Sequence, residues 1–463
     1  MRKLPLFFLV FATLNCFSQN KQILYNFTSV PQSLLTNPGS DVKYQWYFGI
    51  PLLSGISANI GSSGFSAYDL FANDGVDFNT KLRNVVNSIT NKDKIAINQQ
   101  LELFNGGFKI GDWQKNTYIS FGMYQEFDML SYMPKDFAIF TLDGNKDHIG
   151  KVFDLGDLNA KAEMLSVFHL GFHKNINEKL IVGVRGKIYS SVFNVSSTKN
   201  SGYFYTIPST NTIYEQVISS NMQVNTSGIA NYLDNNSVNT KSDIIKKMLL
   251  GGNLGLGFDA GITYYPKKNI QFTASILDVG FIKHTKEIEN YTYKGYYKYQ
   301  GITPDFTNPN ATQDVFQEFK DAIPFDTLHK KYTTWRPVKF NTSFQYSFGD
   351  GRNSTCNCQG NEVEYKNSIG AQLYVMSTPR IPFTAFTTYY RRKILNGLEA
   401  KATYTLDSFS YKNIGLGLSA TIGKVNFYLL ADNLLEYRDI SKAKSLSFQF
   451  GLNIILRDKN TLD

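Results

Sequence analysis

Between residues 413 and 456, apolar side chains alternate strictly with small or polar ones, and this pattern restricts this part of the chain to one kind of secondary structure. Over 413–422 every second residue is apolar or small, and the residues between them include Gly415, Gly417 and Ser419. The pattern continues past a tight turn at Gly423 and Lys424 and returns over 445–456. Successive side chains point to opposite faces of a strand, so this period of two predicts β-strands rather than an amphipathic helix.

The two faces of these strands differ in a way that suits a membrane. One face is large and apolar, and the other is small and polar, a pattern that recurs as Gly255, Gly257, Asp259, Gly261 and Thr263. A soluble β-sandwich would bury the apolar face in a shared core, and it gives no reason for the small face. In lipid, strands must close on themselves so that every backbone group is paired. We therefore predict an all-β fold, a transmembrane antiparallel β-barrel with a polar lumen.

The N-terminus has the features of a secretory signal peptide. Arg2 and Lys3 precede the apolar run 4–14, and small residues follow up to Ser18, which predicts a signal over 1–18. Cys16 could suggest a lipoprotein, but Asn15 is a poor residue before a lipidated cysteine. No other apolar run reaches the ~18 residues of a spanning helix. The mature protein, from residue 19, is therefore expected to cross the Gram-negative outer membrane with strands.

Strand count and loop lengths agree with such a barrel. About fourteen strands fit between residues 45 and 457, and an even number places both ends on one side. Short turns follow alternate strands, whereas the long segments 127–163, 194–252 and 281–337 fall on the other side, which is expected to be extracellular. The first strand covers 46–53, where Pro51 requires an edge or a bulge. Helical spacing over 79–89 predicts a short helix within a loop.

The remaining segments complete the predicted organisation. An aromatic girdle is expected at the inner membrane interface, beside short turns, and its candidates are Trp113, Tyr264, Tyr265, Tyr389 and Tyr390. Residues 19–44 are polar and interrupted by prolines, so they either fold into the barrel mouth as a plug or form a flexible terminus. The barrel itself is assigned to 45–457, and residues 458–463 form a C-terminal tail.

Charge and composition do not favour a nucleic-acid partner. The net charge of +9 falls to +7 (9 − 2) once Arg2 and Lys3 leave with the signal, which is modest for 463 residues. No basic cluster contains interleaved aromatic residues, the usual footprint of nucleic-acid binding. A solvated loop surface and a mildly cationic lumen account for the excess.

Histidines and cysteines give no catalytic or metal site. His169 and His173 share one face of a strand, but at ~3.3 Å per residue they lie about 13 Å apart, too far to bind one ion. Cys356 and Cys358 are placed to form a small local disulfide in an oxidising compartment, or they are an inert pair. No nucleophile, base or cofactor motif remains, so we predict that the protein is not an enzyme and binds no cofactor.

Charged residues at the alternate strand positions predicted to face the lumen are the main candidates for function. With the two histidines, they are Arg185, Lys187, Asp259, Lys339, Glu399 and Lys401. Such residues either line a polar pathway that selects solutes or fill a closed interior with salt bridges. A barrel of about fourteen strands is wide enough for either outcome.

Several segments resemble a widespread family of Bacteroidota outer-membrane proteins. They are 254–266 (LGLGFDAGITYYP), 275–282 (SILDVGFI), 299–302 (YQGI), 50–57 (IPLLSGIS) and 64–66 (GFS). The resemblance implies an outer-membrane barrel from a family of unknown function. The architecture is also similar to fourteen-stranded long-chain fatty-acid transporters and to barrels associated with type IX secretion, but a shared fold does not establish function.

Two functional hypotheses of different class follow. In the first, the barrel transports small or hydrophobic solutes past an N-terminal plug. In the second, the barrel is a non-transporting anchor whose long loops bind secreted or surface proteins, and the tyrosines of 291–299 suit either role. An outer-membrane hydrolase is the least favoured class, because no catalytic set is present. An open pathway through the lumen would support transport, and a blocked lumen would support the anchor.

Overall fold

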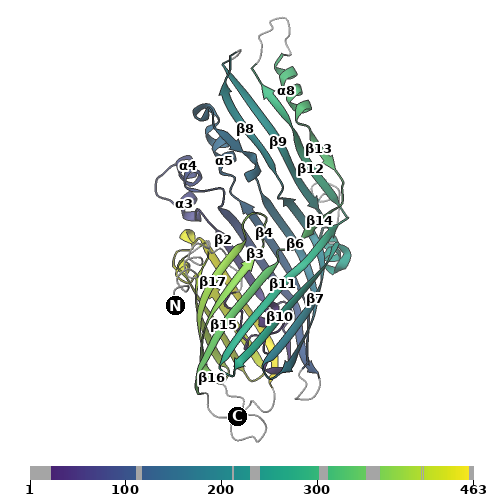
Figure 1. The fold of residues 1–463 in the computed structure, drawn as a ribbon, viewed down its shortest axis with the longest axis vertical. Helices are drawn as coiled ribbons and strands as arrows, with labels where there is room; N and C mark the ends of the chain where they lie inside the picture. The colour runs from purple at the N-terminus through teal and green to yellow at the C-terminus, as the bar shows by residue number, and fades with distance from the viewer. Residues whose placement is uncertain are drawn as a thin grey trace, which may run out of the picture.

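We describe a computed structural model of the chain, which covers residues 22–110, 117–210, 213–229, 240–301, 311–350, 365–407, 409 and 411–457. Its strands close into an antiparallel barrel of 14 strands (Figure 1). In order around the barrel these are β1 (Tyr44–Gly49) with β2 (Ile56–Ser62), β3 (Lys94–Ile110), β4 (Thr117–Tyr132), β6 (Ala160–Asn177), β7 (Leu180–Ser197), β10 (Asn253–Lys267), β11 (Ile270–His284), β15 (Lys339–Asp350), β16 (Tyr365–Met376), β17 (Phe383–Leu395), β18 (Leu398–Leu406), β19 (Asn413–Ile422), β20 (Val425–Asp432) and β21 (Ser445–Arg457). β21 pairs with β1 and β2 and closes the ring. The predicted transmembrane β-barrel is confirmed.

The first wall strand is interrupted by a bulge over residues 50–55. Gly49 lies opposite Asn453 and Ile56 opposite Phe450, so these six residues span the length of two residues of β21. Pro51 lies in the bulge, where its missing N–H removes no ladder hydrogen bond. Leu52 has a φ of +64° and points outward with 53% of its surface exposed. The strand predicted over 46–53 therefore ends at Gly49 and resumes at Ile56.

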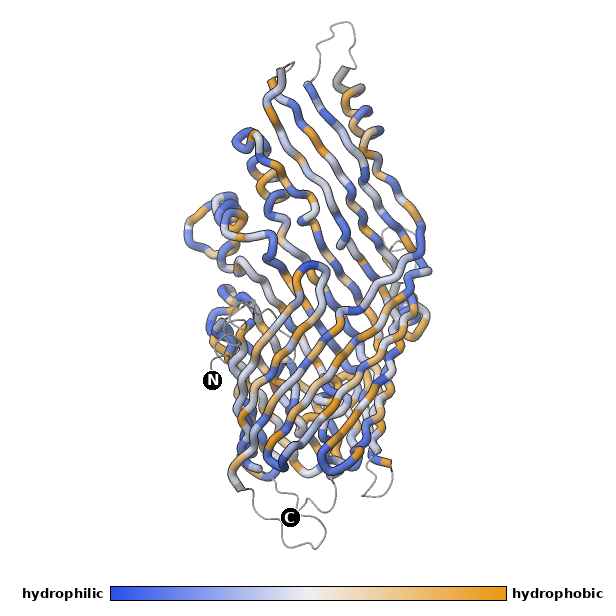
Figure 2. Tube along the Cα trace, viewed as in Figure 1, coloured by the Kyte–Doolittle hydropathy of each residue, from blue (hydrophilic) through white to orange (hydrophobic). Residues whose placement is uncertain are grey.

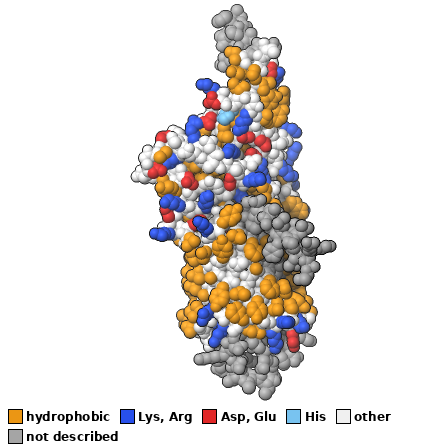
Figure 3. Space-filling model, turned by 60° about the vertical axis from the view of Figure 1, so that its left-hand side comes forward, with side chains coloured by type: hydrophobic (Ala, Val, Ile, Leu, Met, Phe, Trp, Pro, Cys, Tyr) orange, Lys and Arg blue, Asp and Glu red, His pale blue; other side chains and the backbone are white. Residues whose placement is uncertain are grey.

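The wall has an apolar outer face and a polar inner face. Leu418 is 36% exposed on the outside, whereas its neighbour Ser419 is 1% exposed on the inside. Along the strands, apolar and polar residues alternate (Figure 2). On the face shown in Figure 3, hydrophobic side chains form a broad band over the barrel, and most charged side chains lie above this band. This arrangement is the one that lipid requires of a barrel wall.

Only half of the predicted aromatic girdle faces outward. Tyr264 and Tyr390 are 43% and 39% exposed, but Tyr389 is 4% exposed inside the lumen. Tyr265 also turns inward and donates a hydrogen bond to Asp41. The expectation failed for these two tyrosines because consecutive residues of a strand point to opposite faces. Trp113 lies outside the described residues.

The two ends of the barrel differ. At one end, the turn end, strands are joined by turns as short as Glu178-Lys179 and Gly423-Lys424. At the other end, the loop end, the long segments predicted as loops contain further strands. β9 (Tyr214–Ser227) pairs with β8 (Ser201–Pro208) and β12 (Ile288–Tyr299), and the sheet rises well above the barrel (Figure 1).

Short elements complete the loop end. They are β5 (Val152–Asp154), β13 (Phe325–Leu328), β14 (Tyr332–Trp335), α3 (Ala67–Phe71), α4 (Phe78–Ser88), α5 (Lys135–Asp143), α7 (Thr240–Lys246) and α8 (Ala311–Ala322), with several single helical turns. α4 is the helix predicted over 79–89. Among the described residues, none of the helices combines the length and hydrophobicity needed to cross a membrane. Residues 1–18, Cys356, Cys358 and 458–463 lie outside the described residues.

Candidate functional site in the barrel lumen

Residues 22–41, called the plug below, occupy the lumen. They run as turns and one short helix, α2 (Ser33–Thr36), and nearly all of them are buried. Ile23, Leu24, Phe27 and Val30 pack together against Tyr428 and a leucine of β20. Further along, Leu34 packs with tyrosines of β1 and β4, and Leu35 packs with residues of β4, β6, β7 and β11. The plug therefore contacts the wall on several sides.

Polar side chains of the wall fix the middle of the plug. The Gln32 amide donates to the carbonyl of Ser54 at 2.8 Å and exchanges hydrogen bonds with Asn453 at 2.9 and 3.1 Å. Ser54 is the residue of the 50–55 bulge that turns inward, and its hydroxyl donates to Glu102 at 2.9 Å. The bulge thus places a backbone carbonyl where the plug can use it.

Cations of the wall hold the backbone of the plug. Lys401 is fully buried and donates to the carbonyls of Ile23 and Tyr25 at 2.9 and 2.6 Å. Arg391, which pairs with Glu399 at 3.2 Å, lies within 3.5 Å of the Asn26 carbonyl. Charge-assisted bonds of this kind are roughly twice as strong as neutral ones. Glu399 and Lys401, both predicted to face the lumen, are therefore part of the plug contact.

Glycines let the plug turn 37–39 lie directly on the wall. A Cβ atom at Gly183 of β7 would come within 2.1 Å of the Pro38 carbonyl oxygen, and one at Gly261 of β10 within 2.0 Å of the Asn37 amide oxygen. The Thr263 hydroxyl donates to the Gly39 carbonyl at 2.7 Å beside this contact. The small residues that alternate along β10 in the sequence thus make room for the plug.

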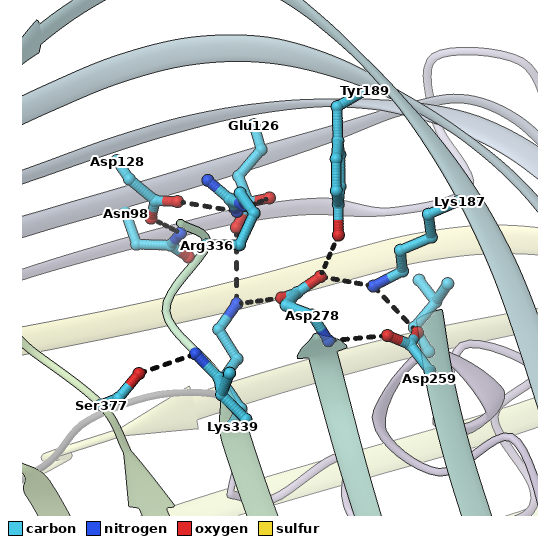
Figure 4. A network of polar contacts seen from close by, with 12 residues as sticks. Asn98, Glu126, Asp128, Lys187, Tyr189, Asp259, Asp278, Arg336, Lys339 and Ser377 are labelled. Carbon is cyan, nitrogen blue, oxygen red and sulfur yellow. Dashed lines mark hydrogen bonds and ion pairs between the residues drawn. The ribbon is translucent and has the colours of Figure 1, made fainter. Parts of the chain in front are cut away.

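A set of buried charges lies next to the plug and is called the charge belt below. Its acidic members are Glu126, Asp128, Glu163, Asp259 and Asp278, and its basic members are Lys161, Arg185, Lys187, Arg336 and Lys339. Five acids face five bases, so the belt has no formal net charge. Figure 4 shows most of the belt converging on Arg336 and Asp278.

Part of the belt crosses the lumen. Arg336 precedes β15, the eighth strand, yet its guanidinium contacts Glu163 of β6 and lies 2.9 Å from Glu126 of β4, the fourth and third strands. Lys339 of β15 lies 3.6 Å from the same Glu126. Arg336 is 2% exposed and stacks over Tyr189 with its carbon 5.6 Å from the ring centre. These contacts bridge the β15 side of the wall to β4 and β6.

A backbone irregularity turns the other part of the belt inward. Asp278 lies at a bulge of β11 with a φ of +59°, and its N–H donates to Asp259 at 2.7 Å. Its carboxylate then bridges Lys187 at 2.6 Å and Lys339 at 2.9 Å. Non-glycine residues rarely adopt positive φ, and such strain often accompanies functional sites.

Arg185 links the belt to the plug. Its guanidinium lies 3.2 Å from Asp259 and also donates to the carbonyls of Leu34 and Leu35, at the end of α2. A small cavity of about 50 Å³ lies between the belt and the plug. Leu35, Thr36, Asn98, Gln100, Asn341 and four belt residues contribute to its lining. Its size suits a few water molecules.

A separate contact, called the clasp below, spans the loop end. Residues 377–382 join β16 and β17, the ninth and tenth strands, but reach the opposite side of the barrel. Arg380 pairs with Asp157 at 2.5 Å, donates to the Asn91 carbonyl at 3.0 Å and lies over the ring of Tyr132. The Tyr132 hydroxyl also hydrogen-bonds to Thr378 at 2.9 Å.

Comparison with known proteins identifies the family of this chain. Residues 38–432 match the family of unknown function DUF5723. The chain belongs to this family. A FadL homologue of Pseudomonas aeruginosa shares its fold weakly, with a TM-score of 0.42, 10% identity, and 94% of this chain and 95% of that chain covered. The Pseudomonas putida toluene transporter TodX gives a TM-score of 0.36 at 9% identity, covering 95% and 97%.

Similarity this low supports no inference about function. No curated protein matches the chain. The resemblance to a family of unknown function is confirmed for this DUF5723 member, whereas an origin in Bacteroidota stays a prediction.

The predicted lumen residues of this DUF5723 member fall into three groups. Arg185, Lys187, Asp259 and Lys339 join the belt, Lys401 contacts the plug, and Glu399 pairs with Arg391, which contacts the plug. His169 and His173 are buried on β6 and join neither group: the ring of His173 stacks on Tyr118 at 5.1 Å between ring centres, and the ring of His169 lies tilted against Tyr124 at 5.9 Å. Across the described part of the chain, no cluster of three or more potential metal ligands occurs.

Sequence reasoning missed six of the ten belt residues. Glu126 and Asp128 follow the lumen-facing parity of β4, so extending the strand predicted up to Glu126 would have found them. Glu163 lies just before the predicted start of β6. Arg336 lies in a connection, where no periodicity applies, and nothing in the sequence signals its reach across the lumen.

Proposed function

We propose that this protein is a gated channel of the outer membrane, closed in the conformation described here, through which small solutes cross when the plug and the clasp separate from the wall. The observation that carries this proposal is the charge belt. Replacing buried ion pairs by apolar packing is often neutral or stabilising, so an inert anchor gains no stability from such an interior. Ionisable groups at membrane depth usually serve a pathway.

The way in which the lumen is closed also favours a channel. Plug, belt and clasp close it through hydrogen bonds, ion pairs and short contacts between groups that belong to different segments. Each contact can separate without unfolding the wall, whose own ladder hydrogen bonds are independent of them. A blocked lumen alone would favour an anchor, but closure by separable polar groups is what a gate requires.

Location in the outer membrane is part of the proposal. The apolar band around a closed barrel and the even strand number fit such a membrane, and the usual asymmetry of bacterial barrels places the turn end in the periplasm and the loop end outside. The plug enters from the end at which β1 begins, the turn end. The wall meets the plug with apolar and aromatic side chains as well as with amides, hydroxyls and charges, but the charge belt beside it favours a small polar solute over a hydrophobic one.

Planar-bilayer recording on matched variants tests the channel. We compare deletion of residues 20–40, the clasp variant Arg380→Ala and their combination, with Arg438→Ala as a control for loss of an exposed arginine of the loop end. The combined variant should give steady conductance, and each single change should give only brief openings. Heat-modifiable mobility verifies assembly. An assembled combined variant that conducts no more than the control would rule out the channel and leave the anchor.

The sheet at the loop end supports a second candidate function, the binding of a protein at the cell surface. β8, β9 and β12 extend beyond the barrel, and exposed tyrosines such as Tyr203 and Tyr296 lie on them. Hydrogen bonds from Lys298 and Gln300 lower the pKa of Glu215 near the tip of this sheet. Removing the tip should abolish surface binding without changing conductance, which would separate the two functions.

A further inference from the structure

We infer that the charge belt is the selectivity filter of the proposed channel and that it favours small dipolar solutes, carrying one positive and one negative group, over uncharged solutes of the same size. The inference rests on the proposed channel function. It concerns what passes, whereas the plug and the clasp determine whether anything passes.

The belt pairs three acids with two cations that come from a different part of the lumen wall. Glu126, Asp128 and Glu163 lie on β4 and β6, and the cations that reach them, Arg336 and Lys339, come from the β15 side. If these groups part to admit a solute, the three acids lie on one side of the gap together with Lys161, and the two cations lie on the other together with Asp278. Charges fixed in this way across a narrow, low-dielectric passage act strongly on a solute between them.

The balance of charges determines which solutes the filter favours. A single ion attracted by one side is repelled by the other, and the five acids and five bases give no net preference for either sign. A dipolar solute can turn its positive group to Glu126 and its negative group to Lys339. It thereby replaces both partners of the pair that it separates, which an uncharged molecule of equal size cannot do.

The position of the cavity ties this filter to the plug. The space of about 50 Å³ beside Glu126, Lys187, Asp278 and Lys339 is bounded on the plug side by Leu35 and Thr36. In the closed conformation it is too small for more than a few water molecules. Withdrawal of the plug removes this boundary and opens the cavity to the periplasmic half of the lumen.

Amide groups beside the belt extend the polar surface. Asn98 and Gln100 of β3 and Asn341 of β15 line the same cavity, and Asn98 donates to Asp128 at 2.5 Å. Such groups can hydrogen-bond to the ammonium and carboxylate of a solute after it leaves the charges. An amino acid or a very short peptide has the size and the charge pattern that the site would recognise.

The test uses the channel lacking residues 20–40 and carrying Arg380→Ala, reconstituted in liposomes. Swelling rates are compared for alanine and lactamide, which are isomers of equal composition, the first dipolar and the second uncharged. We expect alanine to enter at least threefold faster. The double variant Glu126→Gln with Lys339→Gln, which keeps net charge and shape, should bring the ratio close to one. Lys424→Gln, in an exposed turn, should leave it unchanged.

Reversal potentials in a salt gradient provide a second measurement. Lys339→Gln alone leaves the belt acidic and should shift the channel towards cations, Glu126→Gln alone should shift it towards anions, and the double variant should shift neither way. If the double variant fails to assemble, Asp128→Asn with Lys161→Gln serves in its place, because these are the most exposed acid and the most exposed base of the belt. This variant should lower the alanine ratio by about half.

The outcomes separate the two proposals. No swelling by either solute would overturn the channel itself. Swelling with equal rates for alanine and lactamide, or a ratio that survives removal of the Glu126–Lys339 pair, would overturn the filter and leave the channel intact. Reversal potentials that do not respond to the single changes would equally exclude the belt as the filter.

Discussion

A methyl group added at Gly183 should loosen the plug, because the wall and the plug backbone meet there without space between them. The Cβ of Gly183→Ala would lie 2.1 Å from the Pro38 carbonyl oxygen, where ordinary contact begins at 3.4 Å. The turn over residues 37–39 must therefore retreat by about 1.3 Å. β7 itself cannot yield, since it is hydrogen-bonded along its length to β6 and β10.

Two hydrogen bonds give the scale of the effect. The turn accepts one from Thr263 at 2.7 Å, and the Asn37 amide donates one to the Ile262 carbonyl at 3.3 Å. A net contribution of about 0.5–1.5 kcal/mol each places the loss of docking free energy at about 1–3 kcal/mol. That corresponds to a 5- to 150-fold larger population of the displaced plug.

Cysteine labelling measures this population directly. Cys356 and Cys358 are replaced by serine, Ser29→Cys is introduced into the plug, and the rate of reaction with a membrane-impermeant maleimide is followed in proteoliposomes. Gly186→Ala is the matched control, because it lies on the same strand and its Cβ meets nothing within 4 Å. Equal labelling rates in assembled Gly183→Ala and Gly186→Ala proteins would refute the close contact between plug and wall.

Three further predictions concern the wall, the membrane and the loop end. Leu418→Arg should impair assembly by about 2–4 kcal/mol and Ile422→Arg, on the same face beside the turn, by about 0–1 kcal/mol; equal heat-modifiable mobility of the two would contradict the assigned depth. The mature protein should remain with outer-membrane fractions after carbonate extraction, and its recovery in the soluble fraction would end the barrel assignment. Because the pKa of Glu215 is lowered in the folded protein, its ionised form stabilises the fold above the carboxyl's ordinary pKa of about 4.3, and this stability is lost as pH falls through the lower folded value. Hydrogen exchange near Lys298 should therefore rise only under acid conditions. A rise near neutral pH would exclude the Glu215–Lys298 pair as the cause.

The wall could be predicted from sequence because lipid imposes a simple rule on it. Every second residue must be apolar and every backbone group must be paired. The bounds of the last three strands, β19, β20 and β21, could therefore be predicted almost as the structure has them. Pro51 predicted the bulge at 50–55. The inward turn of Ser54 could not be predicted, because it depends on the plug residue Gln32, which is distant in sequence.

Above the membrane that rule no longer applies, and the individual strands of the loop end were not predicted. α5 and β5 cover part of β8 and β9, and α8 packs on β12, so no regular alternation of apolar and polar residues marks these strands in the sequence. Only four of the ten belt residues were predicted, for a related reason. Asp259 and Lys187 follow the parity of regular strands, whereas Asp278 is turned inward by a bulge and Arg336 reaches the lumen from a connection.

Arg185 explains why opening of the plug and hydration of the belt should occur together. Its buried guanidinium has Asp259 on one side and the carbonyls of Leu34 and Leu35 on the other. Withdrawal of the plug removes both carbonyls, and a buried charged group left without its partners costs several kcal/mol. Water or a polar solute must therefore follow the plug into the space it leaves. A hydrocarbon could fill the same volume but could not replace those acceptors, so the residue that holds the plug closed also sets what can enter once the plug has moved.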